Sequence, residues 1–173
     1  MSRRALLTGL ALATLVFANE SHAQTTAART AMWYRKSRAL EITGADPRDS
    51  VVLTALGKRA DSLAISMTFY VDGVAKHRQR WTSEDELYDN DDLRKSPAKL
   101  NAFMRTRLDD ILKMVNRDTI SWELVKHMGD EPLLRRIKPL PTHQVMFSFA
   151  FETSTFLAWD PVRRRLVVFM ECC

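Results

Sequence analysis

The sequence predicts an α+β fold in which an antiparallel sheet is packed by one long helix and one or two short helices. Three observations predict it: a β-hairpin pattern over residues 63–81, an amphipathic helix pattern that begins at Ser96, and a three-stranded meander within residues 143–173. A chain of 173 residues suits one domain and needs neither a metal nor a disulfide to hold a core.

The first 23 residues have the layout of a cleavable export signal. A basic pair at residues 3–4 precedes an apolar run over residues 5–18, and small residues at 21–23 suit a cleavage site. The apolar run is shorter than the roughly 20 residues that span a bilayer, although a retained membrane anchor is the alternative. The basic pair also resembles a twin-arginine signal, so the general secretory and twin-arginine routes both stay open. We expect an extracytoplasmic protein, either periplasmic or secreted.

The rest of the chain divides into a short segment, residues 24–45, and a single α+β domain, residues 46–173. The segment begins with small polar residues and continues with Met32-Trp33-Tyr34, so we expect it to be mobile or to dock on the domain. A membrane-surface contact of the aromatic pair is the alternative. Without residues 1–23 the net charge falls from +5 to +4. This modest excess favours anionic surfaces but lacks the concentrated basic element of a nucleic-acid-binding protein.

Residues 50–57 are ambiguous between helix and strand. Asp46-Pro47 is typical of a helix start, and Gly57 can end a helix. The β-branched pair Val51-Val52 favours a strand instead.

Residues 63–81 alternate apolar and polar side chains around an Asp72-Gly73 turn, which predicts a hairpin. A simple two-residue turn would place three cations on the apolar face, at a prohibitive cost. We therefore predict a three-residue loop, residues 71–73, with a bulge that pairs Met67 with His77.

Residues 82–95 form an acidic connection. Its spacing does not match a calcium-binding EF-hand loop, so we expect a solvated loop. Ser96 then caps a helix of about 19 residues, whose polar side mixes both charge signs and whose apolar side faces the core. A second helix is expected over residues 121–128, and a further helical turn over residues 130–137.

Residues 143–173 form the meander, with a turn at residues 153–154 that would pair Phe149 with Ala158. Both faces of the meander are apolar, so we expect both to be covered. Helices on one side and the N-terminal segment on the other are one solution, while a subunit interface or an apolar ligand is another. The basic run at residues 163–165 is expected in a solvated turn.

The candidate binding residues are polar or aromatic side chains within or beside the apolar strands. They are His77, Trp81, His143, Trp159 and Glu171. A histidine pair with a carboxylate such as Glu171 would make an acid–base or metal site, although nothing in the spacing requires one. No nucleophile elbow and no phosphate-binding glycine loop occurs in the sequence. We predict no catalytic residue, no metal and no cofactor.

Cys172 and Cys173 are the only cysteines. Neighbouring Cα atoms lie about 3.8 Å apart, closer than in relaxed disulfides, so a bond between the two would be strained. They are candidates for redox chemistry or for a cross-link to another chain.

These observations favour a non-enzymatic binding or assembly module of the cell envelope. Its partner would be a protein or an apolar small molecule, not nucleic acid, and a homodimer is compatible with the pattern. The mature chain has no expected transmembrane span. One alternative is a small hydrolase or metal-dependent enzyme that uses His77 or His143 with a carboxylate. Another is a secreted structural protein cross-linked through its two C-terminal cysteines.

Overall fold

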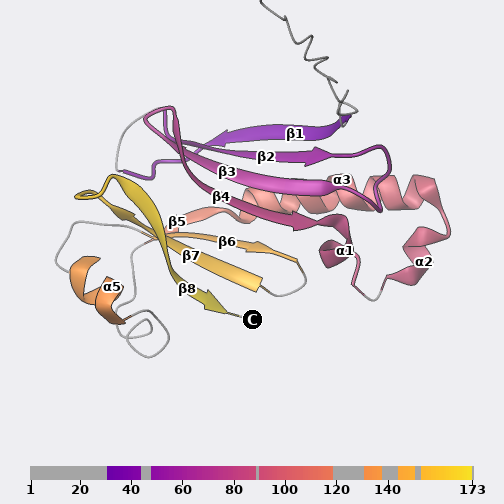
Figure 1. Cartoon of the computed structure of the whole chain (residues 1–173). Coiled ribbons are helices and arrows are strands. Elements are labelled where there is room, and N and C mark those ends of the chain that lie inside the picture. The colour runs from indigo at the N-terminus through magenta and orange to yellow at the C-terminus, as the bar shows by residue number, and fades with distance from the viewer. Residues whose placement is uncertain are drawn as a thin grey trace, which may run out of the picture.

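The computed structural model describes residues 31–43, 48–88, 90–118, 131–137, 144–150 and 153–172. Its strands form two four-stranded antiparallel sheets, with strand orders β1-β2-β3-β4 and β5-β6-β7-β8, and the long helix α3 packs against both (Figure 1). The α+β antiparallel class is confirmed. The hairpin and the meander, which we expected in one sheet, belong to separate sheets.

Each sheet is built from strands that are close together in the sequence. The first sheet contains β1 (Met32–Ala39), β2 (Ser50–Leu56), β3 (Ala64–Val71) and β4 (Val74–Thr82). The second sheet contains β5 (Asn116–Asp118), β6 (Gln144–Phe149), β7 (Thr153–Asp160) and β8 (Arg165–Cys172). The helices are α1 (Ser83–Glu86), α2 (Asp91–Arg94), α3 (Pro97–Met114) and α5 (Glu131–Ile137).

The ambiguous stretch at residues 50–57 is a strand, β2. Val51, Leu53 and Ala55 are fully buried, and the residues between them are half-buried, which is the two-residue period of a strand. The strand pairs with β1 on one side and β3 on the other, and its β-branched residues suit that central position. The helix interpretation is wrong, and its expected start at residues 46–47 lies outside the described residues.

The β3–β4 hairpin has the predicted faces but not the predicted register. Asp72 and Gly73 have φ angles of 54° and 74°, which fit a tight two-residue turn in place of the expected three-residue loop. The extra residue sits at Lys76, within β4, so that Phe69 pairs with His77. This bulge keeps the arginines of β4 off the apolar face, as the argument from charge burial required.

The aromatic residues of the N-terminal segment dock on α3 through β1. The Tyr34 hydroxyl donates to Asp109 Oδ1 at 2.7 Å, and Lys36 Nζ forms an ion pair with the same oxygen at 2.7 Å. The Arg105 guanidinium lies 4.5 Å from the centroid of the Trp33 ring, a cation–π distance. Much of the segment that we expected to be mobile or docking is therefore an edge strand of the first sheet.

Helix α3 begins where the sequence predicts. The Ser96 hydroxyl accepts the N–H of Lys99, and Pro97 takes the first helical position, where no N–H is needed. The buried side of the helix carries leucine, isoleucine and methionine at three- and four-residue spacing: Leu100, Met104, Leu108, Ile111 and Leu112.

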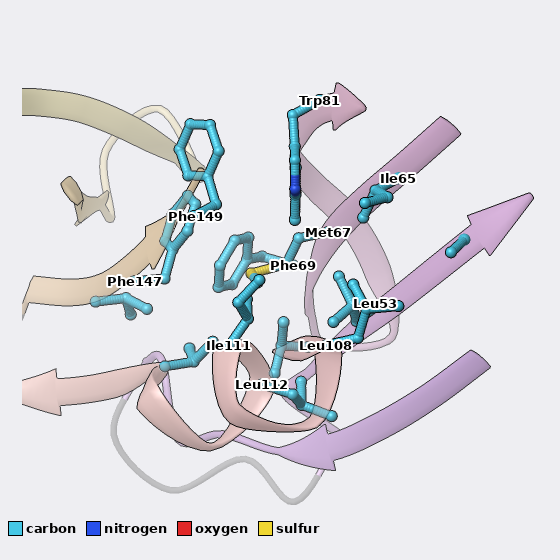
Figure 2. Close-up of a cluster of buried hydrophobic side chains, with 14 of the residues drawn as sticks. Leu53, Ile65, Met67, Phe69, Trp81, Leu108, Ile111, Leu112, Phe147 and Phe149 are labelled. Carbon is cyan, nitrogen blue, oxygen red and sulfur yellow. The ribbon is translucent and has the colours of Figure 1, made fainter. Parts of the chain in front are cut away.

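One hydrophobic core lies between the first sheet, α3 and β6 (Figure 2). The Phe69 and Phe147 rings are 5.1 Å apart, and the Trp81 and Phe149 rings are 5.0 Å apart. Helix α3 packs against β1 and β2, whereas the aromatic pairs hold the second sheet against β3 and β4. Helix α3 and the second sheet therefore each cover part of the inner face of the first sheet.

The meander forms as predicted, but its first turn lies earlier in the chain. Phe149 pairs with Thr153, not with Ala158 as the expected turn at residues 153–154 required. Thr153 and Ser154 continue the strand instead, and the Ser154 hydroxyl hydrogen-bonds the Ser148 hydroxyl across the pair at 2.9 Å. β-Branched and hydroxyl side chains pair well across strands, which favours this register.

Both faces of the meander are apolar and partly covered, as expected. The face that meets the first sheet contributes Val145, Phe147, Phe149, Leu157 and Leu166 to the main core. The other face forms a second cluster, made of Ala158, Val167, Phe169 and Met170 with Leu133 of α5. The N-terminal segment does not cover this second face as we expected, because its described strand is β1 of the other sheet.

Glu86 lies in the acidic stretch that we expected to be solvated, yet its side chain is fully buried. Its carboxylate accepts the Ala150 N–H at 2.6 Å and forms an ion pair with Arg107 Nε at 2.7 Å. Arg107 Nη2 also donates to the Ala150 carbonyl at 3.0 Å. We name these three residues the Glu86 clamp. It joins α1, α3 and the end of β6, and so ties the first sheet and its helices to the second sheet.

Two further points concern helices. The helix predicted over residues 121–128 lies outside the described residues, and the turn predicted over residues 130–137 is α5. Within the described ranges, no helix combines the length and the apolar character needed to cross a membrane.

The Glu86 clamp makes a stability prediction. Arg107→Met leaves the Glu86 carboxylate buried without its cation, so we expect the free energy of unfolding to fall by about 3 kcal/mol. Urea denaturation monitored by circular dichroism measures the change. Arg94→Met is the matched control, because it breaks the exposed ion pair with Glu84 and should cost less than about 1 kcal/mol. Equal losses in the two variants would contradict the role of the clamp.

Candidate functional site

A cavity of about 520 Å³ lies where β4 and β8 meet α5 and the β7–β8 turn. Its volume falls within the roughly 300–1,000 Å³ of small-molecule sites. Its lining residues come from four separate elements: His77, Pro132, Leu133, Arg136, Arg163, Arg165, Leu166, Val167 and Val168. We name it the His77 cavity.

The bulge in β4 places His77 on the inner face of the first sheet. Its ring lies 6.0 Å from that of Phe69, and its Nε2 atom is buried without a hydrogen-bond partner among the described residues. Burial lowers the pKa of His77 below its ordinary value of 6.5, so the imidazole is neutral at pH 7. Buried polar atoms in proteins normally have a partner, so this nitrogen is an exception among the described residues, while the residue as a whole lines the cavity.

The arginines of the cavity differ in how far their charge is neutralised. Arg136 Nη2 lies 3.2 Å from Asp160 Oδ2, and the other Asp160 oxygen accepts the N–H groups of Val162 and Arg163, each at 3.1 Å. Burial alone would raise the pKa of Asp160, but these hydrogen bonds and the nearby arginines outweigh it and hold the pKa below its usual value. Arg163 and Arg165 are exposed, and neither forms an ion pair with a residue that the structure describes.

The remaining wall of the cavity is aliphatic. Leu133 comes from α5, and Leu166, Val167 and Val168 come from the start of β8. Val168 is one of the exposed large apolar residues of the chain, at 37% of its maximal exposure. The cavity therefore combines two guanidinium groups that form no ion pair with a described residue, one uncharged imidazole and an apolar strand.

A second cavity, of about 340 Å³, lies near the start of α3 and also has basic residues in its wall. There Arg59 pairs with Asp61, and Arg94 pairs with Glu84. These arginines are already neutralised within the protein. The unpaired arginines of the His77 cavity therefore make it the stronger candidate for an anion.

The other predicted binding residues do not line the His77 cavity. Trp81 shares the inner face of β4 with His77 but packs on Phe149 in the core, and its Nε1 is buried without a partner in the described part of the chain. Trp159 is half-buried against the main core, and Glu171 is exposed on β8. His143 lies outside the described residues.

The cysteine predictions stay untested by the structure. Cys172 ends β8, with a side chain that is not described, and Cys173 follows the described range. A cross-link through either residue remains a prediction.

An acid–base role for His77 finds no support in its surroundings. Burial is the one cause of its lowered pKa, and none of its described neighbours is a carboxylate bonded to it. Among the residues that the structure describes, no three histidine, cysteine, aspartate or glutamate side chains are placed to hold a metal ion.

The arginines were missed because the run at residues 163–165 was interpreted as a solvated turn. All three side chains are indeed exposed. However, Arg163 and Arg165 line the cavity and Arg164 does not. Arg163 and Arg164 lie in the β7–β8 turn, and Arg164 has a φ angle of 50°, so the shape of the turn separates Arg164 from its neighbours. Neither this separation nor the contribution of Arg136 could be predicted from the sequence, because the first depends on the turn and the second on where α5 packs.

Comparison with known protein families, with curated proteins and with solved structures finds no match to this chain.

The lowered pKa of His77 makes a prediction about stability and pH. A histidine whose pKa is lower in the folded chain stabilises the fold above about pH 6.5, and this contribution is lost as the pH falls through the folded-state pKa. We expect the free energy of unfolding of the natural protein to fall more steeply between about pH 7 and 5 than that of His77→Gln. Urea denaturation at several pH values measures both slopes. Carboxylates titrate equally in both proteins, so parallel curves would contradict the burial of His77.

Proposed function

We propose that the protein is a non-enzymatic binding module whose His77 cavity holds a small amphiphilic anion. The observation that carries the proposal is the presence, on the wall of one cavity, of His77 and of two arginines, Arg163 and Arg165, that form no ion pair with a described residue. Carboxylate and phosphate groups are the anions that a guanidinium binds best, through paired N–H donors. The head group of the ligand would bind Arg163 and Arg165.

The aliphatic wall supports an apolar body on the same ligand. Leu166, Val167 and Val168 run along β8 away from the arginine turn, and burying a methylene group against such a wall contributes about 0.8 kcal/mol. A small inorganic anion would leave this wall unused, and a neutral hydrocarbon would leave the arginines unused. A molecule with a charged head and an alkyl chain uses both.

His77 gives the site a means of adjusting to its ligand. A neutral imidazole has one donor and one acceptor nitrogen, so a ring on the cavity wall can bond either an anionic oxygen or a hydroxyl. A bound anion would also favour the protonated imidazole, because opposite charges in a site of low polarity stabilise each other. Affinity for an anion should therefore increase as the pH falls toward 6.

The expected location fits this proposal. The layout of residues 1–23 favours export, and an exported module would meet its ligand in the cell envelope or outside the cell. The absence of a described acid–base partner for His77 favours binding over hydrolysis.

Titration of the full chain with dodecanoate, followed by calorimetry, tests the proposal. We expect Arg163→Gln and Arg165→Gln each to weaken binding about tenfold, because a hydrogen bond to a charged group contributes roughly 1.5–3 kcal/mol. Arg164→Gln is the matched control: it removes the same charge from the same turn without changing the cavity wall, and should weaken binding less than about twofold.

Dodecanol, which has the same chain without the charge, is the ligand control and should bind more weakly than dodecanoate. Equal binding of the two molecules would show that the arginines do not recognise the head group. Equal losses in the Arg164 and Arg163 variants would assign the effect to net charge and reject the cavity.

A further inference from the structure

The outer face of the first sheet is the side turned away from α3 and from the second sheet. The strand register places its side chains in rows across β1, β2, β3 and β4. One row is Arg35, Thr54, Ser66 and Arg80; the next is Ser37, Val52, Thr68 and Arg78; a third is Ala39, Ser50 and Tyr70 with Ala75. We name these twelve residues the outer face.

The outer face carries cations and hydroxyl groups but no carboxylate. Arg35 stands on one edge strand, and Arg78 and Arg80 stand on the other, with all three side chains exposed. Hydroxyl groups lie at the centre: Thr54 Oγ1 is 2.8 Å from Ser66 Oγ, and Thr68 Oγ1 accepts from Arg78 Nε at 3.1 Å. None of the three arginines forms an ion pair with a residue in the described ranges.

The other side of the same sheet is different. There the basic residues of β1 have acidic or carbonyl partners on α3: Lys36 pairs with Asp109, and Arg38 donates to the carbonyls of Lys113 and Val115. On the inner side, Lys36 and Arg38 have partners within the fold, whereas the three arginines of the outer face have no ion-pair partner among the described residues. The outer face is therefore the electropositive surface of this sheet.

None of the helices and strands that the structure describes lies over the outer face (Figure 1). A second copy of the chain is a poor occupant, because two such faces would bring six arginines together without a counter-charge. An apolar partner would find few contacts among the twelve, since Val52 and Tyr70 are their large apolar or aromatic residues. The next row on the same side, Met32, Leu56, Ala64 and Thr82, adds apolar residues at one end of the sheet only. Charge complementarity calls for an anionic partner.

We infer that the outer face docks on an anionic lipid bilayer. The two basic edges lie about 14 Å apart, three strand spacings, so a planar array of phosphates can reach both edges at once. A single-stranded polyanion is normally held in a groove with several stacking aromatic rings, and this face offers one tyrosine. Such a position would bring the module to a surface where amphiphilic anions are found, but the inference does not depend on the His77 cavity.

Sedimentation of the full chain with vesicles tests the inference. The vesicles contain phosphatidylcholine alone or with about 30% phosphatidylglycerol, whose negative charge supplies the attraction. We expect stronger binding to the anionic vesicles and a loss of this difference at about 1 M salt, where charges are screened within about 3 Å. The neutral vesicles measure the contribution of the apolar run over residues 5–18, which is the same in every variant.

The deciding variant is the triple substitution R35Q/R78Q/R80Q. Each arginine near an anionic surface should contribute about fivefold, so the triple variant should bind the anionic vesicles roughly a hundredfold more weakly. The matched control is K95Q/K99Q/K113Q, which removes three exposed charges from α3 and the residue before Ser96 and should change binding less than about threefold. Circular dichroism confirms that both variants remain folded.

Three results would overturn the inference. The triple arginine variant and the lysine control could bind anionic vesicles equally. The full chain could bind heparin and ignore the vesicles, which would assign the face to a soluble polyanion. R163Q/R164Q/R165Q could lose vesicle binding while R35Q/R78Q/R80Q keeps it, which would move the membrane contact to the β7–β8 turn.

Discussion

The first sheet has an apolar inner face too broad for one helix, and the rest of the structure depends on how that face is covered. Helix α3 covers the side of β1 and β2, and the second sheet covers the side of β3 and β4. Aromatic contacts alone hold two such surfaces together without fixing their relative position, because hydrophobic contact has no direction. The Glu86 clamp supplies direction: a buried carboxylate accepts one backbone N–H from the second sheet and faces one guanidinium from α3.

The candidate site results from the same arrangement, in which α3 and the second sheet each cover part of the inner face of the first sheet. Strand β4 is an edge strand of the first sheet, and His77 on its inner face lies beside Phe69 of the main core. Strand β8 and α5 complete the wall from the other side. A cavity at the seam between two sheets is thus a direct result of covering one face with two unequal elements. The arginines reach it because the β7–β8 turn lies at the same end of the seam.

The sequence was a good guide to which face each side chain takes, and a poor guide to register. Burying three cations is too costly, so the charge pattern of β4 required an irregularity in the hairpin. An extra residue in the turn or an extra residue in the strand would both keep the cations off the apolar face, and only the three-dimensional structure distinguishes the two. The meander shows the same limit: strand propensity extends through Thr153 and Ser154, while the turn lies just before them. A shift in register leaves composition unchanged, so composition cannot reveal it.

The candidate site was predictable in part. The inner-face position of His77 follows from alternation on β4, whereas the separation of Arg164 from its two neighbours depends on the conformation of the β7–β8 turn. Glu86 and Arg136 do not follow, because each acts through contacts with elements far away in the sequence. Within the acidic stretch nothing distinguishes the buried glutamate from the solvated carboxylates around it. Burial of a charged residue is decided by its tertiary partners, which no local pattern contains.

The distance in sequence between Glu86 and Ala150 has a consequence for biosynthesis. The four strands of the first sheet are complete before residue 83, but the aromatic residues that shield half of it are made more than 60 residues later. At a translation rate of about 5–20 residues per second, the apolar inner face of the first sheet therefore stays partly uncovered in the nascent chain for several seconds. During that interval the exposed apolar face is a target for chaperones that bind apolar surface.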